Sequence, residues 1–259
     1  MPKFSANLSM LFTEAGFADR FERAAKAGFK GVECQFPYEL PKEDIAGILD
    51  KYGQEMVLHN IPSGDWAAGE RGIACLPGRE NEFQDGVGKA IEYGKALKCP
   101  RINCLVGLTP KDVPADRVRQ TLVKNLKFAA DALQKAGISM LVESLNSHDI
   151  AGFYLTDTAM TLQLMDEVNH PNLYYQYDIY HMQVMEGNMT KTIRDNISRI
   201  GHIQLADVPG RHEPGTGEIN FTNLFKFIDE AGYTGWIGCE YKPAGVTEDG
   251  LGWAKPYLK

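Results

Sequence analysis

Oxygen-bearing side chains stand at or near the ends of several β-rich runs in this sequence. Glu143, Asp178 and Glu240 each end such a run, and Gln204 stands on another, two positions after His202. Carboxylates that are buried together repel one another unless a cation, a proton or a hydrogen-bond donor lies among them. A ligand set made only of oxygen atoms favours Mg²⁺ or Mn²⁺ over zinc. The run ends therefore predict a divalent metal site.

Two histidines are further candidates for the same site, because His59 and His181 lie at or just after run ends. His202 lies one layer deeper than Gln204, which favours a buried structural role. The alternative for all of these residues is a register shifted by one position, since that shift turns each side chain toward the outer face of its strand. In that case they are turn or cap residues.

The elements that must position these residues alternate along the whole chain. Short β-rich runs are followed by longer amphipathic segments, which is typical of βα units in parallel order. The predicted strands are Phe4–Asn7, Gly31–Gln35, Met56–His59, Arg101–Val106, Ile138–Glu143, Leu173–Asp178, His202–Ala206 and Trp236–Glu240. The predicted helices are Phe17–Ala27, Asp44–Lys51, Glu82–Leu97, Ala115–Lys135, Thr158–Val168 and Phe221–Ala231.

Eight such units in 259 residues predict an α/β fold, a closed (β/α)₈ TIM barrel that forms a single domain over residues 1–259. In this fold the active site lies at the carboxyl ends of the strands, where the polar residues stand. A doubly wound open sheet is the alternative, but the segment after the first predicted strand has no glycine-rich phosphate turn.

Composition narrows the classes of partner. The net charge of −7 opposes a nucleic-acid partner, because nucleic-acid binding needs a basic surface. No apolar run approaches the ~18 residues of a membrane span, and the segment MPKFSANLSM lacks the apolar stretch of a signal peptide. The five cysteines include no CxxC pair, which favours reduced thiols over disulfides. A cytoplasmic protein without a membrane partner is expected.

Six segments, which together extend from about Lys3 to Trp253, carry a resemblance to a known family. They are PKFSANLSMLFTE, HNIPSGDWAAGERGIACLPGRE, INCLVG, YDIYHMQ, RHEPGTGEINF and GWIGCEYKP. These segments resemble the hydroxypyruvate isomerase family of the xylose-isomerase-like barrel superfamily, which also includes sugar epimerases and endonuclease IV. The resemblance implies a barrel that interconverts hydroxypyruvate and tartronate semialdehyde through an enediolate, in carbohydrate-acid and glyoxylate metabolism.

The resemblance also implies roles for particular residues. It places the two acid/base glutamates at Glu143 and Glu240, and the metal ligands at Glu143, Asp178, Gln204 and Glu240. The epimerase relatives carry histidine where this chain has Gln204, and a neutral amide is the weaker ligand, so a metal-independent reaction stays open. The alternative activity is that of 2-oxo-tetronate isomerase, whose substrate is one carbon longer.

The implied substrate is a small hydroxy or oxo acid, whose carboxylate needs a cationic partner. Arg71, Arg211 and Lys242 are the candidates, because each lies in a loop near a strand end. The alternative is that all three are solvated charges on the surface with no role in substrate binding. The loop around Trp66 is expected to cover the substrate, and the Met-rich segment Tyr180–Met185 is expected to be an exposed loop that favours a homo-oligomer.

Two other classes of function remain as alternatives. An endonuclease IV-like nuclease would use a histidine-rich zinc cluster and a basic surface, and this chain has six histidines and a negative charge. A barrel that binds a sugar acid without turnover is favoured only if one of the two glutamates is missing, and both are present.

Overall fold

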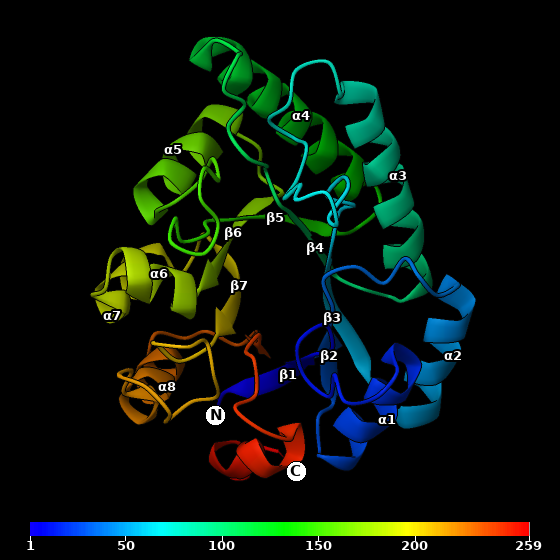
Figure 1. The fold of residues 1–259 in the computed structure, drawn as a ribbon, viewed down its shortest axis with the longest axis vertical. Coiled ribbons are helices and arrows are strands. Elements are labelled where there is room, and N and C mark those ends of the chain that lie inside the picture. The colour runs from blue at the N-terminus through cyan, green and yellow to red at the C-terminus, as the bar shows by residue number, and fades with distance from the viewer. Residues whose placement is uncertain (259) are drawn as a thin grey trace.

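The centre of the molecule is a closed barrel of eight parallel strands (Figure 1). The computed structural model describes residues 1–258. Each strand pairs with the next one along the chain, and β8 closes the ring against β1. The strands are β1 (Lys3–Asn7), β2 (Gly31–Glu33), β3 (Glu55–Asn60), β4 (Arg101–Cys104), β5 (Ser139–Glu143), β6 (Leu173–Asp178), β7 (Ile200–Leu205) and β8 (Trp236–Cys239). The predicted (β/α)₈ barrel is confirmed.

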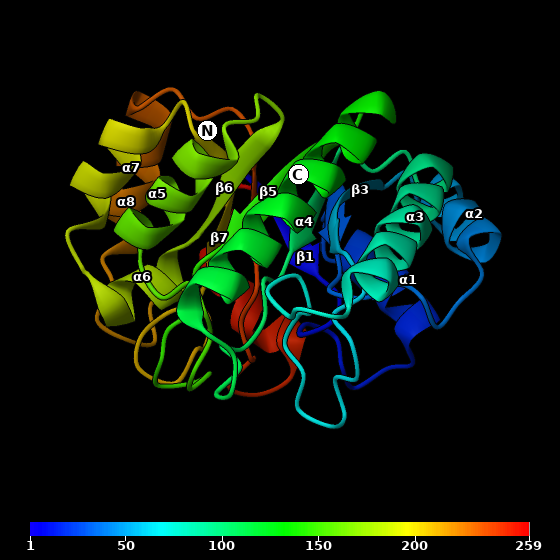
Figure 2. The same ribbon diagram turned by 90° about the horizontal axis from the view of Figure 1, so that it is seen from above.

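The helices surround this ring on its outside (Figures 1 and 2). They are α1 (Phe17–Lys26), α2 (Lys42–Tyr52), α3 (Glu80–Ala96), α4 (Ala115–Lys135), α5 (Thr158–Val168), α6 (Ile179–Met185), α7 (Met189–Asn196), α8 (Phe221–Glu230) and the 3₁₀ helix η1 (Thr247–Trp253). The six predicted helices are present with small shifts at their ends. The sequence analysis missed α6, α7 and η1, because seven or eight residues are too few for a helical apolar period to be recognised.

The barrel wall separates two kinds of interior. Apolar side chains fill the space between the strands and the helices. A second, small apolar cluster of Val57, Leu58 and Leu141 packs against Tyr174 and Trp236. The inward positions nearer the carboxyl ends are polar and buried: Ser5, Asn7, Glu33, Asn103, Glu143, Gln176, His202 and Gln204. The polar cluster therefore lies where this fold forms its active site.

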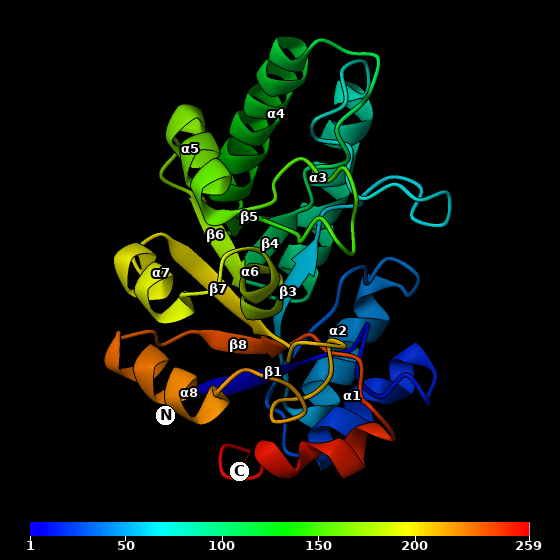
Figure 3. The same cartoon turned by 60° about the vertical axis from the view of Figure 1, so that its left-hand side comes forward.

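Two long connections cover the carboxyl ends of the strands. Residues 61–79 join β3 to α3 and project away from the barrel (Figure 3). Gly72 has a φ of +111°, and a Cβ at that position would lie 2.0 Å from the carbonyl oxygen of Leu105, so only glycine allows the loop to pack there. In the connection from β7 to α8, the Asp207 carboxylate accepts hydrogen bonds from the backbone N–H groups of Val208, Gly215, Gly217 and Ile219.

The segment Tyr180–Met185 was expected to be an exposed loop, and this expectation is wrong. It forms α6, and Tyr180, His181 and Met182 are buried. The Asp178 carboxylate accepts the backbone N–H of Tyr180 and so starts the helix directly at the end of β6. The segment therefore leaves only Val184 and Met185 partly exposed among its apolar side chains. In the described part of the chain, no helix combines the length and the apolar character needed to cross a membrane.

Candidate active site

A small cavity lies at the carboxyl ends of the strands. Its volume is about 90 Å³. It is lined by Gln35, Asn60, Trp66, Arg71, Leu105, Glu143, Leu145, Ile150, Gln176, His181, Arg211 and Glu240. Three of these residues end or lie in strands β3, β5 and β6, and the others stand after strand ends, in α6 or in loops that include both covering connections. Their mixture of charged, amide and apolar groups fits a small polar molecule.

The two predicted glutamates both line this cavity. Glu143 ends β5, and its Oε2 accepts one hydrogen bond, from the Asn103 amide at 2.9 Å. Glu240 directly follows β8. Its Oε1 accepts from the amides of Asn7 at 3.0 Å and Gln35 at 3.1 Å, and its Oε2 accepts from the Arg211 guanidinium at 2.7 Å. Three donors thus hold Glu240, whereas one donor holds Glu143.

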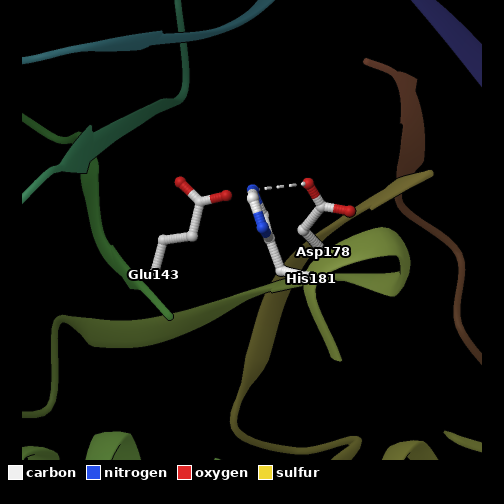
Figure 4. A group of neighbouring side chains, drawn as sticks. All are labelled: Glu143, Asp178 and His181. Carbon is white, nitrogen blue, oxygen red and sulfur yellow. Dashed lines mark ion pairs between the residues drawn. The ribbon is translucent and has the colours of Figure 1, made fainter. Parts of the chain in front are cut away.

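Asp178 belongs to the same group of carboxylates. It is the last residue of β6 and is fully buried. Its Oδ2 lies 3.4 Å from Arg211 Nη2 and 3.6 Å from His181 Nε2 (Figure 4). Arg211 therefore bridges Asp178 and Glu240, and its guanidinium also stacks on the Tyr180 ring at 4.9 Å. This arginine is the resident cation of the cluster.

The buried carboxylates depart strongly from their ordinary acidity. Burial, and then the charges of Glu240 and Asp178, raise the pKa of Glu143 well above its usual value. Burial also raises the pKa of Asp178 to about 7, although Arg211 opposes the change. The pKa of Glu240 is raised by burial and lowered by Arg211, with a net upward shift. In the absence of a further cation, the cluster therefore holds protons at neutral pH.

His181 has a defined tautomer. Its Nδ1 accepts the backbone N–H of Asn146 at 3.1 Å, so the proton of the neutral ring is on Nε2. Burial, and then the charge of Arg211, lower the pKa of His181 well below its usual value, which keeps the ring neutral. The Nε2–H group points toward Asp178 (Figure 4). His181 is thus a hydrogen-bond donor here, because a metal ligand would need a bare nitrogen.

Arg71 lines the cavity from the loop between β3 and α3. Its Nη1 donates to the carbonyl oxygens of Trp66 and Glu70, and its guanidinium stacks on the Trp66 ring at 4.0 Å. Trp66 in turn packs edge-on against Phe36. Among residues 1–258, no carboxylate lies within ion-pair distance of Arg71. Its charge is therefore available to an anion in the cavity.

The structure does not bring every predicted residue to the cavity. The side chain of His59 points outward from β3, is fully buried and lies beside the ring of Tyr38. Its position follows from the alternation of side chains along the strand, since Asn60 is the residue that faces the cavity. Lys242 has an exposed side chain and does not line the cavity, although its backbone N–H donates to Arg211. Neither His59 nor Lys242 lines the cavity, and their contact with a substrate stays a prediction.

Gln204 lies on the inner wall of β7, in the layer beneath the cavity. Its Oε1 accepts from the Gln176 amide at 2.6 Å, and its Nε2 donates to Glu33 at 2.7 Å. A carbonyl oxygen has two lone pairs, so one remains for another partner. His202 also lies inside the wall, where its Nε2 is 2.8 Å from Glu33. The structural role predicted for His202 agrees with this contact.

The sequence analysis missed the amides that surround the glutamates. Asn7, Gln35, Asn103 and Gln176 contact the catalytic candidates or line the cavity. Their signal was present in the sequence. Asn7 and Gln35 stand at the ends of the first two predicted strands, and Gln176 shares the face of Asp178 at a spacing of two residues.

The donor set can be tested against a divalent cation. One ligand atom each from Glu143, Asp178 and His181 lie within 4.8 Å of one another. His181 presents an N–H group, but Glu143, Asp178 and Glu240 supply hard carboxylate oxygen atoms, and Arg211 is the cation that pairs with two of them. Burial raises the pKa of each of these carboxylates, and Arg211 offsets this only in part, so a bound cation would stabilise their ionised forms. The residues fit a hard divalent cation.

Comparisons with known proteins agree with this geometry. The model of a family described as xylose isomerase-like TIM barrel matches residues 21–257. Hydroxypyruvate isomerase from Escherichia coli is 55% identical, over 99% of this chain and 100% of that protein. A 2-oxo-tetronate isomerase from Cupriavidus necator is 46% identical, over 100% of this chain and 99% of that protein.

Two solved structures extend the comparison. A Brucella melitensis protein described as an AP endonuclease of family 2 superposes with a TM-score of 0.98 at 44% identity, over 100% of both chains. The 3-keto-D-glucoside 4-epimerase of E. coli has a TM-score of 0.81 at 17% identity, over 99% of both chains, and shares the fold. The chain therefore belongs to the xylose isomerase-like TIM barrel family and to its group of isomerases that includes hydroxypyruvate isomerase and 2-oxo-tetronate isomerase.

Proposed function

We propose that this enzyme interconverts hydroxypyruvate and tartronate semialdehyde. The observation that carries the proposal is the pair Glu143 and Glu240, which line one small cavity together with the unpaired cation of Arg71. The 55% identity to hydroxypyruvate isomerase supports the substrate. The reaction moves a carbonyl group between adjacent carbons, and it needs a base for one carbon and an acid for the other.

Environment assigns the two glutamates different starting states. Glu240 is the base, because three donors including Arg211 stabilise its carboxylate. Glu143 is the acid, because burial and two neighbouring carboxylates favour its protonated form in the metal-free chain. From hydroxypyruvate, Glu240 takes a proton from the carbon that bears the hydroxyl group. The hydroxyl proton then moves to the neighbouring oxygen of the enediolate, and Glu143 delivers a proton to the former carbonyl carbon. The reverse reaction exchanges the roles of the two glutamates.

Other residues of the cavity bind and orient the substrate. Arg71 forms an ion pair with the substrate carboxylate, since it is the lining cation that lacks a carboxylate partner in the described chain. His181 donates its Nε2–H to a substrate oxygen, where negative charge develops in the enediolate. Trp66 and the loop between β3 and α3 close the cavity from above and limit access of water.

A divalent metal is part of the proposal. Mg²⁺ or Mn²⁺ would be held by Glu143, Asp178 and Glu240, with the free lone pair of Gln204 as the fourth ligand. When bound, such an ion neutralises charge on the substrate oxygens during proton transfer. The neutral amide of Gln204 makes this site weaker than one with imidazole in its place.

Two alternatives are distinguished by the cavity. A nuclease must admit a nucleotide and bind a polyanion, whereas this cavity is about 90 Å³ and the chain has a net charge of −7. We therefore do not assign endonuclease activity despite the description of the Brucella melitensis structure. The 2-oxo-tetronate isomerase activity has a specific basis in the relative at 46% identity, and it would use the same glutamates on a longer acid.

Turnover of the two acids tests the proposal directly. Purified enzyme is expected to isomerise hydroxypyruvate with a higher kcat/KM than 2-oxo-tetronate, because the cavity is small. Treatment with EDTA should lower the rate, and Mn²⁺ should restore it. A preference for the longer acid would transfer the assignment to the sister activity. Absence of turnover with both acids would refute the isomerase proposal.

Substitution of the glutamates tests their separate roles. Glu143→Gln and Glu240→Gln should each lower kcat by roughly 10³-fold, since each removes a proton-transfer group. In D₂O, Glu143→Gln should still exchange the C3 protons of hydroxypyruvate, whereas Glu240→Gln should not. Glu213→Gln, which changes a buried glutamate outside the cavity, is the matched control and should retain most of the activity. Exchange by the Glu240 variant would reverse the assignment of base and acid.

Arg71 is expected to act in substrate binding. Arg71→Ala should raise KM for hydroxypyruvate by roughly 10- to 100-fold, which corresponds to the loss of one charge-assisted hydrogen-bonded pair. The effect on kcat should be smaller. Lys242→Ala is the control, because this cation lies near the site with an exposed side chain. An unchanged KM in the Arg71 variant would exclude the proposed ion pair.

The carboxylate cluster predicts how stability depends on pH in metal-free protein. The folded chain keeps Asp178 protonated up to about pH 7, whereas its ordinary pKa is 3.8. Because the folded state binds more protons between these values, stability falls as pH rises from 4 toward 7. In EDTA, the gain in Tm from pH 7.5 to pH 5.5 should therefore be smaller in Asp178→Asn than in wild type. Asp116→Asn, on the exposed face of α4, should leave that gain unchanged.

A further inference from the structure

A fourth buried carboxylate, Glu33, lies in the barrel beneath the cavity and does not line it. Four donors converge on it. The amides of Asn7 and Gln204 donate to Oε1 at 3.1 and 2.7 Å. Ser5 and His202 contact Oε2 at 3.0 and 2.8 Å. Four contacts at two oxygens are the complement of an ionised carboxylate.

Glu33 dictates which way two glutamine amides point. A carboxylate only accepts hydrogen bonds, so Gln204 must turn its NH₂ group toward Glu33. The carbonyl oxygen of Gln204 then faces Gln176, which must offer its own NH₂ group in return. The carbonyl oxygen of Gln176 is then the polar group of this amide pair that has no hydrogen-bond partner in the described chain. Gln176 lines the cavity, and this oxygen is buried.

A buried acceptor without a hydrogen-bond partner destabilises the folded protein, and a ligand that donates a hydrogen bond to it removes that cost. The ligand group must be a hydrogen-bond donor, and the substrate of the proposed function supplies one in its hydroxyl group. Glu33 also reaches the base. The NH₂ group of Asn7 lies between Glu33 Oε1 at 3.1 Å and Glu240 Oε1 at 3.0 Å, and so ties the two carboxylates together.

The neighbouring strand is built around this carboxylate. Gly238 stands two residues before Glu240 on β8, and a Cβ at that position would lie 2.3 and 2.4 Å from the two oxygens of Glu33. Because Gly238 has no side chain, the Glu33 carboxylate has space beside β8. A methyl group there would displace the carboxylate from its donors while keeping its charge.

We propose that Glu33 is a positioning residue that sets the direction of the Gln204 and Gln176 amides, so that Gln176 Oε1 accepts a hydrogen bond from the substrate hydroxyl group. The inference rests on the proposed function for the identity of that hydroxyl. The consequence is selectivity: the site distinguishes a hydroxy acid from its deoxy analogue through an amide that Glu33 orients from the layer below.

Binding of two unreactive acids tests this proposal. Glycerate and lactate of the same configuration differ by the hydroxyl group on C3. By calorimetry, wild type should bind glycerate roughly three- to tenfold more tightly than lactate, which is the effect of one neutral hydrogen bond. In Glu33→Gln the ratio should fall to within about twofold of one, because the amide introduced there both donates and accepts and no longer forces the NH₂ group of Gln204 toward it.

Three variants make the result specific. Gln176→Leu should abolish the ratio directly. Gly238→Ala should lower it by displacing the carboxylate, and it carries the test if Glu33→Gln does not fold. Gln54→Leu removes a buried amide that donates to the carbonyl oxygen of Phe29 and does not contact Glu33, and it should keep the wild-type ratio. Equal loss in Gln54→Leu would show a general disturbance of the barrel and would overturn the amide-direction proposal.

Catalysis provides a second readout. Glu33→Gln should lower kcat for hydroxypyruvate by roughly 10- to 100-fold. In this variant the Asn7 amide, which donates to both Glu33 and Glu240, loses one of the two carboxylates that fix its position. A Glu33 variant with wild-type kcat and wild-type selectivity would refute the role of Glu33. Absence of hydroxypyruvate turnover in wild type would refute the proposed function alone, because the glycerate-to-lactate ratio is measured without turnover. A wild type that does not distinguish the two acids would refute the acceptor role of Gln176.

Discussion

Four carboxylates share the inner wall and mouth of this barrel, and their mutual repulsion is the constraint that organises the site. Glu33, Glu143, Asp178 and Glu240 are each at least nine-tenths buried. Such groups persist only where donors, protons or cations compensate each one. The structure uses a different compensation at each position: four donors at Glu33, an arginine shared by Asp178 and Glu240, and a raised pKa at Glu143.

These differences in compensation are what make two glutamates chemically unequal. The pKa of Glu33 lies below its usual value. Burial acts to raise it, but His202 and the amide donors outweigh burial. Glu143 has one amide donor and two anionic neighbours, and its pKa moves in the opposite direction. Identical side chains thus differ in how readily they hold a proton, and the three donors at Glu240 against the one at Glu143 extend this inequality to the pair that lines the cavity.

The barrel accommodates this polar interior because its stability comes from elsewhere. The main apolar core packs the strands against the surrounding helices, and a second apolar cluster of three residues is small. Loops then add the cations that the strands lack. Arg211 comes from the loop that Asp207 organises, and Arg71 comes from the loop that packs through Gly72. The site therefore combines a rigid wall with two arginines that reach in from outside it.

The sequence by itself determined the fold and the carboxylates. Alternating β-rich and amphipathic segments predict eight βα units, and a residue that ends a parallel strand lies at the barrel mouth whatever its neighbours are. Glu143, Asp178 and Glu240 follow from that rule. His59 did not follow, since a shift of one residue reverses the face of a strand, and Asn60 faces the cavity instead.

Only the tertiary structure decided the hydrogen-bond partners. Contacts such as Glu33 to His202 or Asn7 to Glu240 join residues 169 and 233 positions apart, and barrel closure brings them together. The tautomer of His181, the amide directions and the lack of a carboxylate partner for Arg71 among residues 1–258 depend on such contacts, so no local pattern encodes them.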